Sequence, residues 1–86
     1  MQDTTKQLLN SADKLFGDIL VEVQDAVARL EAMVESANEG VERAVDDKDN
    51  EAIISMIRRL STLKGAQTHL STRYFMEKDA MDGILS

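Results

Sequence analysis

Between Leu9 and Ala37, apolar residues recur at intervals of three and four without interruption. The members of this stripe are Leu9, Ala12, Phe16, Ile19, Val23, Ala26, Leu30, Met33 and Ala37. A strand would alternate every second residue, whereas steps of three and four place side chains on one face of an α-helix, at heptad positions a and d. The pattern therefore predicts a long amphipathic helix, over about residues 4–37, that packs against another helix.

Further apolar side chains widen this stripe on both flanks. Leu20, Val27 and Val34 stand at heptad position e, and Leu8 and Leu15 stand at position g. The combined apolar face is wider than one neighbouring helix can cover. We therefore expect these five side chains to remain partly exposed in an isolated hairpin and to belong to a surface that binds a partner.

A second stripe with the same steps follows later in the chain. Its members are Ile53, Met56, Leu60, Leu63, Gln67, Leu70, Tyr74, Glu77, Met81 and Ile84. Two of them, Gln67 and Glu77, are polar. Gly65 lowers the stability of the helix in its middle by roughly 1 kcal/mol relative to alanine. We expect a second helix over about residues 51–85, less regular than the first.

The segment between the stripes, residues 38–50, combines Gly40 with a crowded run of charged and amide side chains. Its low helix propensity predicts the turn region, with Asp49 or Asn50 capping the second helix. Asp3 or Thr4 has the side-chain oxygen needed to cap the first helix.

The predicted fold class is all-α, a single domain over residues 1–86. Two long antiparallel amphipathic helices form a helical hairpin, which self-association or a partner helix completes. The alternative is a compact three-helix bundle, in which the chain breaks at Gly40 and Gly65.

The charge distribution argues against binding to nucleic acid. The net charge is −6, and residues 1–50 carry 12 acidic and 5 basic side chains, against 4 and 5 in residues 51–86. A phosphate backbone needs a basic surface, which the first half lacks. The asymmetry instead allows an acidic first helix to lie beside a mildly basic second one, or against a copy of it.

No combination of residues predicts catalysis, a cofactor, a metal site or a small-molecule substrate. The chain has no cysteine and one histidine, His69, so neither a Cys–His nor a Ser–His pair is complete. Carboxylates do share helix faces, as Asp18 with Glu22 and Glu31 with Glu35, but they lack the histidines of a dinuclear metal bundle. We therefore predict that the protein is not an enzyme.

The sequence predicts neither a membrane-spanning helix nor a cleavable secretory signal. No apolar run approaches the eighteen or so residues of a membrane span. The first residues show no basic segment followed by an apolar stretch, so no cleavable secretory signal is expected. The predicted partner is protein, and the predicted location is the cytoplasm.

The second helix resembles the needle subunits of bacterial type III secretion systems. The resemblance covers roughly residues 45–85 and is carried by short elements at similar spacing, which are Asp49-Asn50, Leu60-Ser61, Ser71-Thr72, Lys78-Asp79 and Met81-x-Gly83-Ile84-Leu85.

This resemblance implies a subunit of a hollow filament, secreted without a cleaved signal. The helix Glu51–Leu85 would form the inner wall, and the first helix would pack outward. The residues that it assigns to assembly are Leu60, Leu70, Tyr74, Met81, Ile84 and Leu85.

Two other functions stay open beside the filament subunit. A small acidic hairpin of this kind suits a cytosolic chaperone or adaptor that holds another helical protein by the apolar face of its first helix. It equally suits an inhibitor encoded by a phage or a plasmid.

Overall fold

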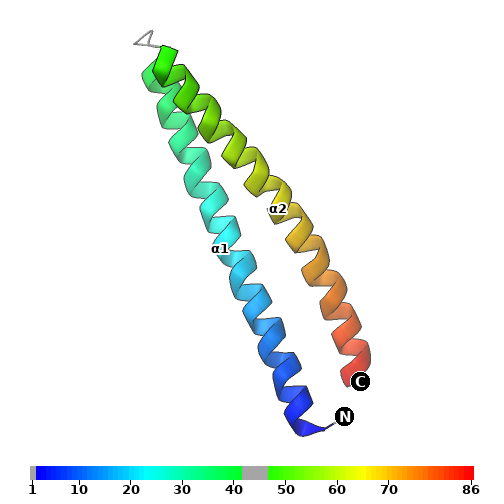
Figure 1. Ribbon diagram of the computed structural model, residues 1–86. Helices are drawn as coiled ribbons and strands as arrows, with labels where there is room; N and C mark the ends of the chain where they lie inside the picture. Colours follow the sequence, from blue (N-terminus) through cyan, green and yellow to red (C-terminus); the bar gives the residue numbers. More distant parts are fainter. Residues whose placement is uncertain (1, 42–46) are drawn as a thin grey trace.

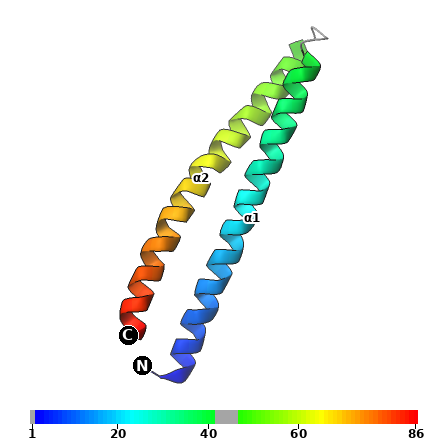
Figure 2. The same cartoon turned by 180° about the vertical axis from the view of Figure 1, so that it is seen from behind.

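The computed structural model describes residues 2–41 and 47–86, which form two α-helices of 39 residues each. Helix α1 spans Asp3–Val41 and helix α2 spans Asp47–Leu85. The helices lie side by side and antiparallel, with both chain ends at the same end of the molecule (Figure 1). The view from behind shows the same two helices, and the described residues form no third element packed on them (Figure 2). The prediction of an all-α helical hairpin is confirmed.

Both helices extend further toward the turn than predicted. Helix α1 continues through Gly40, and α2 begins at Asp47, so Asp49 and Asn50 are helical residues and not caps. A single glycine costs a helix only about 1 kcal/mol. Asp47 and Asp49 also favour a helix start, because carboxylates interact well with the positive end of the helix dipole. Residues 42–46, the middle of the predicted turn region, lie outside the described part of the chain.

Helix α2 runs through Gly65 without a break, so the alternative of a three-helix bundle is wrong. The space beside Gly65 is open, and the flanking turns pack on α1, which outweighs the low propensity of one residue. At the other end, the backbone N–H of Lys6 donates to the carbonyl of Gln2 at 3.0 Å. Helix α1 therefore starts at Asp3, and Thr4 lies inside its first turn.

The core of the hairpin is a narrow seam between the two helices. Four hydrophobic side chains are buried among the described residues: Leu20 and Val27, each 6% exposed, Val34, 9%, and Ile53, 7%. The expectation that Leu20, Val27 and Val34 would be partly exposed is therefore wrong. Helix α2 covers heptad positions a and e of α1, so the prediction that the seam lies along positions a and d is wrong.

The physical reason lies in the side chains that each choice buries. Position e offers large side chains in three successive heptads, at Leu20, Val27 and Val34, whereas two members of position d are alanines, Ala12 and Ala26. Burying the e positions removes more apolar area from water. The other d residues remain on the surface, with Ile19 43% and Met33 58% exposed.

The seam of α2 follows the predicted stripe until its last two turns. Leu60, Leu70, Tyr74 and Met81 are half-buried, as are the other predicted members between Met56 and Tyr74. Beyond Tyr74 the seam moves by one position. Lys78 and Leu85 become half-buried, while Glu77 and Ile84 are exposed.

Candidate functional site: an apolar groove on one face of the hairpin

The two broad faces of the hairpin differ in the contacts that join α1 to α2 across the seam. On one face, ion pairs join the helices: Lys78 Nζ lies 3.6 Å from a carboxylate oxygen of Asp13, and Lys64 Nζ lies 2.8 Å from one of Glu31. We call this the bridged face. The long basic side chains lie across the seam there and connect α1 to α2 at two levels.

Tyr74 is the centre of the contacts between the helices near the chain ends. Its ring meets that of Phe16 edge to face, with centroids 5.6 Å apart at 75°, an arrangement favoured by aromatic quadrupoles. The ring reaches this position because α1 has Gly17 opposite it. A Cβ at residue 17 would lie 3.3 Å from Tyr74 Oη, closer than ordinary van der Waals contact.

Lys78 connects this aromatic contact to the ion pair. Its ammonium group donates to Tyr74 Oη at 3.4 Å and lies 5.4 Å from the centroid of the same ring. The hydrogen bond to Tyr74, and next the charge of Asp13, raise the pKa of Lys78 above its ordinary value of 10.5. The bridged face is thus closed by partners that stabilise the charged form of the lysine.

The opposite face carries an apolar groove, and we call it the groove face. Four hollows open along it between the helices. On α1 they are lined by Leu9, Ala12, Phe16, Leu30, Met33 and Ala37, which lie on one side of that helix, and by polar neighbours that include Arg29 and, at the edge shared with the bridged face, Asp13. On α2 the hollows are lined by one side of the helix, and the residues there include Met56, Arg59, Leu63, Ala80, Met81 and Ile84.

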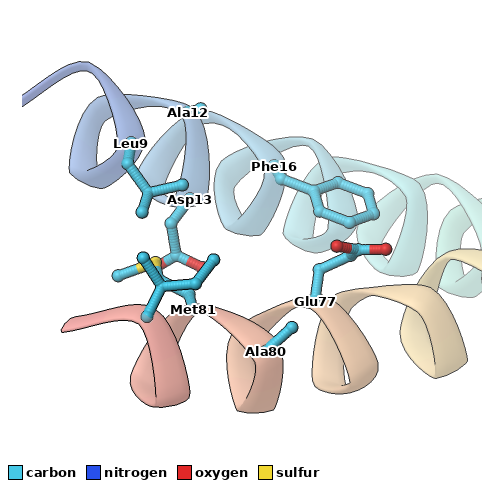
Figure 3. A pocket seen from close by; sticks show the side chains of 8 residues that line it. Leu9, Ala12, Asp13, Phe16, Glu77, Ala80 and Met81 are labelled. Carbon is cyan, nitrogen blue, oxygen red and sulfur yellow. The ribbon is translucent and has the colours of Figure 1, made fainter. Parts of the chain in front are cut away.

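The hollow nearest the chain ends shows how the groove is built (Figure 3). It holds about 230 Å³ and lies between Leu9 and Phe16 of α1 and Met81 of α2, which line its walls. The carboxylate of Glu77 is directed from α2 toward α1 beside Phe16. That carboxylate also pairs with Arg73 one turn earlier, so the rim of the hollow is polar and its walls are apolar.

Large apolar side chains stand exposed along the α1 side of the groove face. Leu8 is 66%, Leu15 62%, Ile19 43% and Met33 58% exposed. Helical spacing places Leu15 one turn from Ile19, and both on the flank away from the lysine bridges. The stripe that the sequence assigns to the hairpin seam therefore contributes its d positions to an open surface.

The predicted interface residues divide into three groups. Leu8, Leu15 and Ile84 are exposed and free to contact a partner. Leu60, Leu70, Tyr74, Met81 and Leu85 are half-buried along the seam of α2. The remaining three, Leu20, Val27 and Val34, have no surface left to offer while α2 covers them.

Ile19 and Met33 were not predicted as surface residues. A signal was present in the sequence, because positions d and g of α1 together form a second, mostly apolar stripe at steps of three and four. That stripe contains Leu8, Ala12, Leu15, Ile19, Ala26 and Met33, interrupted by Glu22 and Arg29.

The structure shows no constellation of ligands for a metal ion. Over residues 2–41 and 47–86, no three His, Cys, Asp or Glu side chains come together in that way. Asp18, Glu22, Glu31 and Glu35 are exposed along α1, and Glu31 is engaged by Lys64. Neither described helix is apolar enough over a sufficient length to cross a membrane.

Comparison with protein-family models, with curated proteins and with solved structures found no match to this chain.

Proposed function

We propose that this chain is a non-catalytic assembly protein that binds helical partners along its groove face. The observation that carries the proposal is the excess of surface on the hairpin. Its accessible area is 6625 Å², whereas a compact monomer of 9.6 kDa exposes about 5,100 Å². A difference of roughly 1,500 Å² is nearly twice the area of about 800 Å² that a standard interface removes from each partner.

The groove face is the best candidate for the surface that becomes covered. It holds the hollows and most of the exposed large apolar side chains of α1, including Leu15 and Ile19. Apolar surface of this extent, rimmed by polar groups, marks interaction sites in proteins. An amphipathic helix laid along the groove would fill it with residues at steps of three and four. A chaperone, an adaptor and an inhibitor would all use this mode of binding.

A filament subunit is the second candidate function, in line with the resemblance to needle subunits. It is favoured by apolar side chains on the bridged side of α2, where Ile54 is 48%, Ile57 43% and Phe75 62% exposed. Contacts on two different faces generate open-ended assemblies, whereas a single self-complementary face closes.

Site-specific photo-crosslinking in the native host tests the proposed function. A photoreactive amino acid at residue 19 would sit on the groove face, and one at Val21, which is 63% exposed, would sit on the outer side of the same helix. We expect protein adducts from residue 19 and few from residue 21. Equal adducts at both positions, or none at residue 19, would contradict the proposal.

The same experiment with the photoreactive group at Phe75 separates the two candidates. A filament subunit should give adducts from both residue 19 and residue 75, since both faces would be covered by neighbours. A chaperone, adaptor or inhibitor should give adducts from residue 19 alone.

A further inference from the structure

We infer that the partner on the groove face is a second copy of this chain, related to the first by a two-fold axis parallel to the helices. The inference rests on the proposed function and names its partner. In this arrangement α1 of each copy lies over α2 of the other, and the four helices form an antiparallel bundle.

The size of the face suits a dimer of this kind. The hairpin measures 63 × 17 × 15 Å, so one broad face offers on the order of 1,000 Å². A stable interface needs about 800 Å² from each partner. Covering the groove face would therefore remove most of the surface excess of the isolated hairpin.

The charges of the two helices select this arrangement of the copies. Helix α1 carries eight acidic and three basic side chains, net −5, and α2 carries six of each, net 0. An axis parallel to the helices places the acidic α1 against the neutral α2 of the second copy. A two-fold axis across the hairpin would instead place α1 against α1, where like charges repel.

In this arrangement, side chains of the two copies meet at the same level, meaning the same height along the helix axes. Within one hairpin, Asp13 is paired with Lys78 and Gly17 lies opposite the ring of Tyr74, which sets the approximate register of the two helices near the chain ends. A two-fold axis parallel to the helices preserves these levels between copies. It therefore sets Leu15 level with Met76 of the second copy, two apolar side chains that are 62% and 54% exposed.

The groove face also contains small residues at matching levels. By the same rule, Ala12 lies within one residue of the level of Ala80 of the second copy, and Ala26 within one residue of the level of Ala66. Alanines that face each other let helix backbones approach closely and leave room for the larger side chains between them.

One ion pair between the copies follows from the same register. Glu22 stands on the α1 edge of the groove face, and no salt bridge within the described hairpin involves it. It falls about one turn from the level of Arg73 on the α2 edge of the second copy, a reach that the long arginine side chain can span. Arg73 pairs with Glu77 in its own chain and has further donors to offer a second carboxylate.

Sedimentation equilibrium on the purified full chain tests the dimer. We expect a single monomer–dimer equilibrium, weakened about tenfold by Glu22→Lys and by Arg73→Glu, and restored to within about threefold of the wild type in the double variant. Circular dichroism confirms that each variant stays helical. A monomer at every concentration up to about 1 mM, open-ended growth, or a double variant weaker than both single ones would overturn the inference.

Disulfide trapping tests the arrangement, and the absence of native cysteines makes it clean. A chain with Leu15→Cys mixed with a chain with Met76→Cys should form a linked heterodimer on oxidation. The matched mixture of Val21→Cys and Met76→Cys should not. Efficient linking of Leu15→Cys to itself, with none in the first mixture, would overturn the arrangement. If the purified chain is a monomer but residue 19 still gives adducts in the host, the inference of a second copy is wrong. The proposed function, binding of a helical partner on the groove face, would still hold.

Discussion

At the scale of single residues, the glycines show how strongly context decides the effect of one methyl group. Nothing lies within 4 Å of a Cβ placed on Gly65, whereas Tyr74 Oη lies 3.3 Å from one on Gly17. In dilute protein we expect Gly65→Ala to raise the free energy of unfolding by about 1 kcal/mol, the usual gain in helix propensity. Gly17→Ala should gain less, because the ring of Tyr74 must shift. Urea unfolding followed by circular dichroism measures both, and a larger gain at residue 17 would argue against the close contact.

The pH dependence of stability should show the interaction of Lys78 with Tyr74 and Asp13. The pKa of Lys78 is raised in the folded protein, first by the hydrogen bond to Tyr74 and then by the charge of Asp13. Its stabilising contribution is therefore fully present below the unfolded value of 10.5 and is lost as the pH rises through the folded pKa.

Urea midpoints of the wild type and Lys78→Met measure that contribution. We expect a small difference, because exposed ion pairs stabilise little, that is constant between about pH 7 and 10 and shrinks above 10.5. A difference that grows above pH 10.5 would mean that the charged form of Lys78 does not stabilise the hairpin.

At the scale of the helices, two valines on α1 separate the seam from the outer surface. Val27 is 6% exposed and Val21 63%. In dilute protein, Val27→Ala should lower the free energy of unfolding by about 2 kcal/mol, from lost burial and an unfilled cavity. Val21→Ala makes the same chemical change and should have an effect within about 0.5 kcal/mol. Similar losses at both positions would show that α2 does not pack on position e.

The sequence predicts the helices more securely than the seam between them. Steps of three and four from Leu9 to Ala37 leave no other secondary structure open. They do not show whether α2 covers position d or position e, because both adjoin position a. That choice depends on how the side chains of α2 fill the space beside Leu20, Val27 and Val34, which is a tertiary effect.

The candidate surface could be predicted only in part, for the same physical reason. The excess of apolar width on α1 was visible in the sequence and correctly placed Leu8 and Leu15 on the surface. The stripe of d and g positions was present in the sequence, but it indicates that Ile19 and Met33 are exposed only once the seam is known to lie on the other flank. The helix ends were misplaced near Gly40 because the cost of one glycine is small beside the packing of a long helix.

At the scale of the whole molecule, the hairpin is only half covered. One face is closed by Lys64 and Lys78, and the other holds an apolar groove between α1 and α2. The narrow core, with four buried hydrophobic side chains among the described residues, makes a lone hairpin a weakly stabilised structure. Covering the groove should stabilise the same two helices without rearranging them.

Thiol labelling of single-cysteine variants at residues 19, 20, 33 and 34 tests whether α2 covers position e of α1 and leaves position d open. These neighbours alternate between the groove face and the buried seam. In dilute protein, we expect cysteines at 19 and 33 to react at least about tenfold faster than those at 20 and 34. At high concentration, the second copy should protect 19 and 33 as well. Labelling at 20 and 34 that is as fast as at 19 and 33 in dilute protein would contradict the seam, and with it the groove.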